Sequence, residues 1–308
     1  MKKGRNVLCQ GIEVKYAFIK RESDNFSIRL MCDVLQVSRS GFYRWSQAIP
    51  SNRARANQRL DIHIKALFIE HKARYGAPRI LMALLQAGIR CSKKRVASRM
   101  KIMDIRAKAK GKFRATTDSG HQHPVFSNIL NRDFNATTMD QKWVSDITYV
   151  HTKQGWLYLA VVIDLYSRSI IGWSMSKRID KDLVCNALLM ALFRRKFPKG
   201  VVVHSDRGSQ YCSKKYRKIL SLNGLIGSMS RKGNCWDNAP CESFFHTLKV
   251  ELIQNRGYET RAEAKQEIFS YIESYYNKKR MHSAIDYRTP YEMECEQKTR
   301  IQLSMKSG

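Results

Sequence analysis

The stretch that most constrains the fold is residues 142–150, Lys-Trp-Val-Ser-Asp-Ile-Thr-Tyr-Val. Its β-branched and aromatic residues predict a buried strand, and a carboxylate, Asp146, stands in the middle of it. An ionised carboxylate in a core strand is unfavourable unless a positive charge lies beside it. For Asp146 alone, an ion pair with an arginine explains the pattern as well as a metal site does.

Two further carboxylates occur where other elements end or begin. Residues 201–206 form a second apolar strand that ends on Asp206, and residues 236–242 open a helix that carries Glu242. Three acidic residues on separate elements can converge on hard cations, and Mg²⁺ prefers oxygen ligands. The three together predict a metal site held by carboxylates.

The charge of the chain predicts a polyanionic partner. Lys and Arg number 56 against 26 Asp and Glu, which gives a net charge of +30. Residues 1–120 hold 27 basic and 8 acidic residues, net +19, so the first part is the more basic one. Cations that neutralise phosphates release condensed counterions, which favours binding to nucleic acid. A ribosomal or architectural protein would show the same charge, so charge alone does not define an enzyme.

The cysteines and the hydropathy favour the cytoplasm. The eight cysteines include no C-x-x-C pair, which argues against a disulfide framework or a zinc ribbon and favours free thiols in a reducing compartment. The sequence contains no signal peptide and no apolar run long enough to cross a membrane. We therefore expect a cytoplasmic protein with no membrane partner.

The first hundred residues have a helical pattern. Residues 27–47 match a helix–turn–helix, in which Ser38 caps a second helix that carries Arg39 and Arg44. Residues 59–72, 78–85 and 93–103 predict three more helices. The last of these is capped by Ser92, and its cations are Lys93, Lys94, Arg95 and Arg99. These basic residues are candidate DNA contacts, although a solvated helix surface would look the same.

The pattern predicts five segments along the chain. A helix–turn–helix segment (1–50) and a basic trihelical domain (51–105) are followed by a basic linker (106–130), a core (131–300) and a tail (301–308). In the core, the strand at 142–150 and two more at 156–163 and 169–173 are spaced for an antiparallel meander. Helices and strands then alternate, which is typical of a layered α/β sheet.

Three motifs resemble the DDE motif of retroviral-integrase-type transposases, with 35 residues between the second and third acidic residues. They are Trp143-x-x-Asp146-x-Thr148-Tyr149, His204-Ser205-Asp206-x-Gly208-x-Gln210-Tyr211 and Asp237-Asn238-Ala239-x-x-Glu242-Ser243-Phe244-Phe245. Further matches are Asp164-Leu165-Tyr166-Ser167-Arg168, Ile171-Gly172-Trp173 and Tyr276-Asn277-x-x-Arg280-x-His282-Ser283-Ala284. Nearly the whole chain resembles the second-frame (OrfB) transposases of the IS-three family of bacterial insertion sequences.

The resemblance implies an RNase H-like core, a mixed five-stranded sheet flanked by helices, preceded by all-α helix–turn–helix regions. Asp146, Asp206 and Glu242 would be the catalytic residues and the ligands of two Mg²⁺ ions, which Mn²⁺ could replace. The implied reaction frees a 3′-hydroxyl at the end of the element and transfers it to target DNA. The implied partners are the terminal repeats, target DNA, further copies of the chain on DNA, and the upstream-frame (OrfA) product, separate or fused.

Helix geometry separates the acidic residues around Glu242. At about 100° per residue, Lys249 returns to within roughly 20° of Glu242, which suits a cation that contacts a phosphate near the scissile bond. Glu251 lies on the opposite side of the same helix, and Asp237 is placed to cap its start. We therefore expect substitution of Glu251 to leave activity intact, and Asn to replace Asp237 at little cost in stability.

Two other functions are compatible with the same residues. A nuclease with this core would hydrolyse DNA without joining strands, and a non-catalytic DNA-binding or regulatory protein would pair its acidic residues with arginines. Joining of a 3′-hydroxyl end to target DNA separates the first from a transposase, and metal dependence of cleavage separates the second.

Overall fold

The computed structural model describes residues 10–108 (without 48 and 50), 124–231, 234–254 and 256–306, in two compact units, Met1–Ala66 and Leu67–Gly308. The first unit holds α2 (Ile12–Arg21), α3 (Ile28–Val34), α4 (Arg39–Ser46) and most of α5 (Asn52–Glu70). Residues 28–46 form the predicted helix pair, and Ser38 Oγ accepts from Gly41 N at 3.2 Å. Helix α2, which the sequence analysis did not identify, completes the buried cluster with Tyr16 and Ile19.

The second unit begins with α6 (Ala77–Gln86) and α7 (Lys93–Ile102). The predicted cap of α7 is confirmed, since Ser92 Oγ accepts from Arg95 N at 3.2 Å, and Gly88 follows α6 with a φ of +77°. Tyr75 joins this segment to the rest of the unit. Its hydroxyl donates to Lys279 O at 3.0 Å and accepts from Met281 N at 2.9 Å.

The middle of the expected linker, residues 109–123, lies outside the described residues. Residues 124–130, which the sequence analysis also assigned to the linker, are packed against the core. The amides of Ile129 and Leu130 donate to Ser228 Oγ at 2.9 and 3.1 Å, and the Leu130 side chain is buried in the core. By these contacts the core extends to residues before 131.

The core is a five-stranded sheet in the order β3-β2-β1-β4-β5. Strands β1 (Lys142–Thr152), β2 (Gly155–Asp164) and β3 (Ile170–Ser176) form the predicted antiparallel meander. Strands β4 (Val202–Ser205) and β5 (Ile226–Met229) join it in parallel, β4 beside β1. Helices α8 (Lys181–Arg194) and α9 (Lys214–Leu222) supply the crossovers that parallel strands need. The predicted mixed sheet is confirmed.

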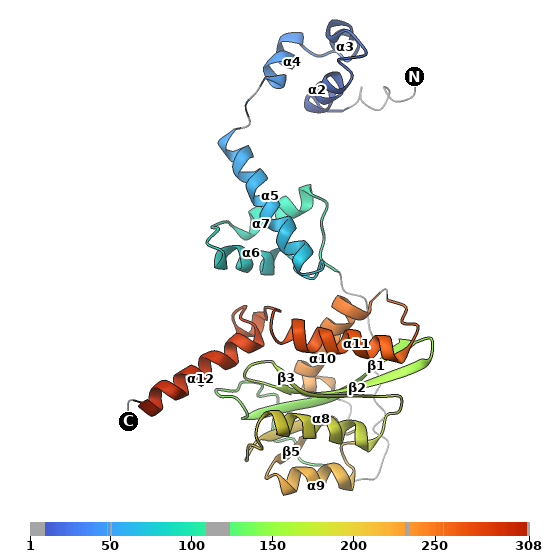
Figure 1. Ribbon diagram of the computed structural model, residues 1–308, viewed down its shortest axis with the longest axis vertical. Coiled ribbons are helices and arrows are strands. Elements are labelled where there is room, and N and C mark those ends of the chain that lie inside the picture. Colours follow the sequence, from blue (N-terminus) through green and yellow to red (C-terminus); the bar gives the residue numbers. More distant parts are fainter. Residues whose placement is uncertain are drawn as a thin grey trace. The chain divides into compact units, whose positions relative to one another are not determined.

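Each face of the sheet is covered by its own helices (Figure 1). On one face, α8 and α9 pack on residues such as Trp143 and Val162. The other face carries α10 (Ala239–Leu248) and α11 (Arg261–Ser270), which pack on Val144 and Val161. Successive residues of a strand point to opposite faces, so Asp146, two residues after Val144, faces α10.

Close packing between β3 and α8 explains why glycine stands at position 172. A Cβ built on this residue would lie 2.2 Å from Ala187 O and 2.8 Å from Ala191 N, both in α8. The backbones of α8 and β3 approach too closely for any larger residue. The Ile-Gly-Trp motif therefore fixes how α8 is seated on the sheet.

The end of the chain is helical, interrupted by π-helical turns. A π-helix (Lys249–Ile253) follows α10, a second one (Tyr271–Tyr276) follows α11, and a 3₁₀ turn (Ser283–Ile285) leads to α12 (Pro290–Lys306). Helix α12 continues past residue 300, where the sequence analysis placed the start of the tail. Within the described ranges, every helix is too short or too polar to span a lipid bilayer.

Glu251 is a buried ion-pair residue. Its carboxylate accepts from Arg280 Nη2 at 2.8 Å and from Tyr271 Oη at 2.8 Å, and its backbone carbonyl accepts from Lys108 Nζ at 2.8 Å. The sequence analysis treated Glu251 as an uninvolved helix residue because its partners lie far away in the chain. The structure corrects this interpretation, since Arg280, which belongs to the motif at residues 276–284, is placed to neutralise Glu251.

We expect Glu251→Gln to lower the free energy of unfolding of the core by about 3 to 5 kcal/mol, because Arg280 would stay buried without a counter-charge. Glu242→Gln is the matched control, since Glu242 is exposed. Urea unfolding at pH 7 measures both. Equal midpoints for the two variants would contradict the structural role of Glu251.

Candidate active site

The sheet register brings Asp146 and Asp206 together. β1 and β4 are parallel, with Val144 opposite His204. The same register, carried two residues further, puts Asp206 beside Asp146 at the end of β4. The predicted proximity of Asp146 and Asp206 thus follows from the pairing of two strands that lie about sixty residues apart in the chain.

The surroundings of Asp146 disfavour the ionised form of its carboxyl. Burial raises the pKa of its carboxyl well above the ordinary value, and the charges of Asp206 and Glu242 raise it further, while Lys249 and a hydrogen bond from Ile147 N oppose the shift. Two carboxylates that share one site repel each other unless a proton or a cation lies between them. A site of this kind is chemically suited to a divalent cation.

Asp206 is held by the turn that follows it. Gly208 N donates to Asp206 Oδ1 at 2.9 Å. A Cβ on Gly208 would lie 2.7 Å from Gln210 Oε1 and 3.1 Å from Asp206 Oδ1. Glycine at this position therefore leaves room for the Asp206 carboxylate at the end of β4. This gives a physical reason for Gly208 in the motif at residues 204–211.

Glu242 is carried by α10, which two buried phenylalanines, Phe244 and Phe245, attach to the sheet. Its side chain is exposed, and the partial desolvation of its carboxyl raises its pKa. In the described part of the chain, no three His, Cys, Asp or Glu side chains are gathered closely enough to hold one metal ion between them. The charge of Glu242 acts on Asp146, but the three carboxylates are not assembled around a single point.

Three polar residues position the site and were missed by the sequence analysis. Asn238 Nδ2, at the start of α10, donates to Ser145 O at 3.1 Å, next to Asp146. Ser145 Oγ donates to Val161 O at 2.8 Å and lies 3.0 Å from Tyr211 Oη, which is fully buried beneath the site. Asn238 and Tyr211 both belong to the motifs, so their presence there was the signal that could have indicated a role.

Lys249 lies at the end of α10, near Asp146. Its Nζ is 5.1 Å from the centre of the Tyr149 ring, which packs edge-on against Trp156. Cation–π contact holds an ammonium group in place without neutralising it. The charge of Lys249 acts on Asp146, and its contact with a phosphate stays a prediction.

The expectation that Asp237 caps α10 is wrong. Asp237 is fully buried, and its carboxylate accepts from Arg132 Nε and Arg231 Nη2, each at 2.8 Å. The residue before α10 is Asn238, whose side chain makes no capping hydrogen bond. The sequence showed an acidic residue at a helix start but not its two arginine partners, of which Arg132 is distant in the chain and Arg231 is near.

His204, another polar residue near the site, has a structural role. His204 is fully buried on β4, with Nδ1 2.9 Å from Ser228 Oγ and Nε2 3.1 Å from Ser230 Oγ. Burial lowers its pKa to about 4, so the ring is neutral at pH 7. His204 therefore ties β4 to β5 and is not placed as a proton carrier.

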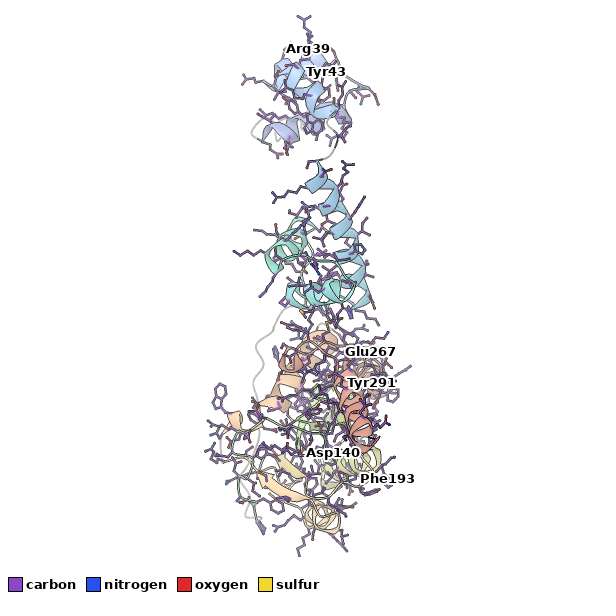
Figure 2. All side chains as sticks on the ribbon, turned by 90° about the vertical axis from the view of Figure 1, so that its left-hand side faces the viewer. Arg39, Tyr43, Asp140, Phe193, Glu267 and Tyr291 are labelled. Atoms are coloured by element: carbon purple, nitrogen blue, oxygen red, sulfur yellow. The ribbon has the colours of Figure 1, made fainter. Side chains whose placement is uncertain are left out.

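The candidate DNA contacts lie on two separate helices. Arg39 and Arg44 are exposed on α4, where Figure 2 shows Arg39 beside Tyr43. On α7, Lys93 and Lys94 are exposed, and the remaining pair, Arg95 and Arg99, is half-buried. No contact in the structure tests whether these residues touch DNA.

The mixed five-stranded sheet with helices on both faces, and Asp146 beside Asp206 on its central strands, fits an integrase-type catalytic core. Family models agree with this class. An integrase core domain matches residues 136–235 and 223–290, and an HTH-like domain matches residues 55–113.

Known proteins resemble nearly the whole chain. The InsF transposase of insertion sequence IS3A from Escherichia coli K12 is 47% identical over 283 residues, which cover 91% of this chain and 98% of that protein. A 31 kDa protein of insertion element IS600 from Shigella sonnei is 46% identical over 260 residues, covering 84% and 96%. The chain therefore belongs to the IS3 family of insertion sequence transposases, and it is a DDE-type polynucleotidyl transferase.

Solved structures resemble the chain more distantly. The catalytic core domain of HTLV-2 integrase in complex with magnesium covers 52% of this chain and 99% of its own, at 14% identity and a TM-score of 0.39. A chain of the simian T-cell lymphotropic virus intasome covers 70% of each, at 15% identity and a TM-score of 0.44.

Asp237 should make stability depend on pH. Hydrogen bonds from Arg231 hold its pKa well below the ordinary value of 3.8, so its contribution is complete above that value and is lost as the pH falls towards the folded-state pKa. We expect Asp237→Asn to lower the free energy of unfolding at pH 7 by about 2 to 3 kcal/mol, since two arginines lose their acceptor.

Below about pH 5, the difference in unfolding free energy between Asp237→Asn and the parent should shrink steadily. Urea unfolding of both proteins at pH 7, 5, 4 and 3 measures this difference, and other acidic groups cancel from it. A difference that stays constant with pH would exclude the ion pairs.

Proposed function

We propose that this transposase cuts DNA at the ends of its insertion sequence and joins the freed 3′-hydroxyl to target DNA, with Asp146, Asp206 and Glu242 holding two Mg²⁺ ions. The observation that carries the proposal is the parallel register of β1 and β4, which places Asp206 beside Asp146. An oxygen-only ligand set of like charges suits a hard divalent cation, and Mn²⁺ is expected to replace Mg²⁺.

The bound cations would supply charge stabilisation to both the attacking and the leaving oxygen of an in-line displacement at phosphorus. The chain itself contributes alignment. The parallel pairing of β1 with β4 fixes the two aspartates relative to each other, while the contact of Asn238 with Ser145 fixes the start of α10 against them. Lys249 is proposed to bind a phosphate of the strand beside the scissile bond, held in place by Tyr149.

A covalent protein intermediate is not part of the proposal. The nearest thiol, Cys241, is fully buried beside Glu242, and burial together with the charges of Asp146 and Asp206 raises its pKa well above the ordinary value. A thiol in that state is a poor nucleophile. Water and the 3′-hydroxyl of the DNA are therefore proposed as the nucleophiles of cleavage and joining.

Partners are also proposed. The cations of α7 (Lys93, Lys94, Arg95 and Arg99) and of α4 (Arg39 and Arg44) are proposed to contact phosphates of the terminal repeats, since most of them are exposed and the first 120 residues carry net +19. Because two element ends and a target must meet, we propose that several copies assemble on DNA. The upstream-frame (OrfA) product is proposed as a further partner, separate or fused, at the bacterial nucleoid.

We expect Glu242→Gln, Asp146→Asn and Asp206→Asn each to abolish cleavage and joining while DNA binding survives, because each removes one charge from the metal site. The measurement is Mg²⁺-dependent strand transfer of a labelled, pre-cleaved element end. Asp182→Asn, exposed on α8, is the matched control and should keep full activity. An active, folded Glu242→Gln would overturn the assignment.

The α7 cations should determine how binding depends on salt. Each phosphate contact contributes about 0.9 to the slope of log K against log salt concentration, so the variant with alanine at Lys93 and Lys94 should lose roughly 1.8 from that slope. Alanine at Lys214 and Lys218, exposed on α9, should leave the slope unchanged. Fluorescence anisotropy of an element-end duplex at 50 to 300 mM salt measures both, and equal slopes would exclude α7 from the interface.

A further inference from the structure

The side chain of Trp236 is exposed to solvent next to the candidate active site. It is 68% exposed, whereas Trp143 in the same domain is fully buried. Phe193 is equally exposed (labelled in Figure 2), but its ring packs edge-on against Phe197 at 5.0 Å. Among the described residues, none stacks on the Trp236 ring or accepts a hydrogen bond from its indole N–H. A large apolar ring without an internal partner is available to a ligand.

The backbone that carries Trp236 is fixed on its C-terminal side. Trp236 belongs to a 3₁₀ turn, Cys235–Asn238, that leads into α10. The next residue, Asp237, is buried and bound to two arginines, and Asn238 is bound to the backbone of Ser145. Two consecutive buried anchors therefore hold the turn, and the ring beside them points away from the core. This arrangement presents the indole in a preorganised way.

The turn is close to the reacting groups in the proposed function. Asn238 bonds the residue before Asp146, and Glu242 follows Asn238 by four residues, or about one turn of α10. Trp236 is thus anchored to the same two elements that carry Asp146 and Glu242. A strand whose scissile phosphate lies at the acidic residues passes within reach of this turn.

The surroundings of the turn are cationic. Arg132 and Arg231, which bind Asp237, remain 45% and 48% exposed at their side chains. Arg207, directly after Asp206, donates from Nε to Ser230 O at 2.7 Å. Single-stranded nucleic acid is commonly bound by aromatic rings that stack on bases, in a groove whose cations follow the backbone. An exposed indole among half-exposed guanidinium groups matches that chemistry.

We propose that Trp236 stacks on a base that is unstacked from its neighbour beside the scissile phosphate, and that it thereby positions the DNA end for cleavage and joining. The proposal rests on the proposed function, because it assumes that the phosphodiester is attacked at Asp146, Asp206 and Glu242. Every base has a π-face, so the contact does not depend on sequence. Trp236 is therefore a binding residue for the end of the strand and not a determinant of which terminal repeat is recognised.

A competing occupant is a second copy of the chain. An exposed indole also suits a protein interface, where tryptophan is enriched among residues that dominate binding. The cations around the turn and its attachment to the acidic elements favour DNA. Crosslinking to DNA and light scattering separate these two occupants.

The first arm uses the full-length protein and a duplex of the element's own end in which 5-iodo-2′-deoxyuridine replaces one nucleotide at a time. Near-ultraviolet irradiation without divalent cation crosslinks a stacked aromatic ring to the iodinated base before any strand is cut. We expect one position, next to the scissile phosphate, to crosslink to the peptide that contains Trp236. Glu242→Gln should give the same crosslink, so this arm reports on Trp236 even if the metal-site proposal fails.

The second arm is kinetic. Trp236→Ala should raise the apparent KM for a pre-cleaved end by about 5-fold to 150-fold, which is the range for loss of one base–aromatic stack, and Trp236→Phe should recover most of it. Phe193→Ala, which removes an equally exposed ring from the opposite face of the sheet, should behave as the parent. Circular dichroism checks that each variant is folded.

Two results would overturn the proposal. One is no crosslink at Trp236 together with unchanged kinetics of Trp236→Ala. The other is no crosslink together with a change in oligomeric state of Trp236→Ala in light scattering, which would assign the ring to a contact between copies. A crosslink to Trp236 with an inactive Glu242→Gln supports both proposals, and a crosslink with an active Glu242→Gln retains the stacking contact and rejects the metal site.

Discussion

The repulsion between Asp146 and Asp206 is the constraint on which the rest of the core depends. Parallel pairing of β1 with β4 brings the two carboxylates together, and both residues are half-buried. A fold gains nothing in stability from such an arrangement, so the surrounding packing must hold it in place. The meander, the crossovers and the helices on both faces supply that packing. The core is therefore stable in spite of its acidic centre, which is the usual relation between a scaffold and a reactive site.

Buried polar contacts carry this stabilisation to the elements around the site. Asn238, Ser145 and Tyr211 connect α10, β1 and the segment before α9, so that the three acidic residues are attached to one network. Asp237 and Glu251 are different, because both are buried acids neutralised by arginines that local helix patterns do not pair with them. In a chain of net charge +30, some of the acidic residues form structural ion pairs with arginines, and only a few acidic residues remain for catalysis.

Sequence patterns predicted the elements better than the contacts between them. The strands, most helix starts and the serine caps follow from local periodicity and local hydrogen bonds, and they agree with the structure to within a few residues. The identity of Asp146, Asp206 and Glu242 came from motif spacing. The roles of Asp237 and Glu251 could not be predicted, because their partners, such as Arg132 and Arg280, are distant in sequence and no local rule pairs them. Helix α2 was missed for lack of a strong cap, since Gly11 precedes it.

The π-helical turn after α10 makes the fold sensitive to the number of residues in this segment. A π-turn accommodates one more residue than an α-helical path of the same length, and here it turns Glu251 towards Arg280. Deletion of a single residue between Lys249 and Ile253 would leave Glu242 untouched. It would also remove the extra residue that the π-turn accommodates, and Glu251 would lose the turn that directs it towards Arg280. The ion pair of Glu251 with Arg280 thus depends on the number of residues in this turn as well as on the amino-acid type at position 251.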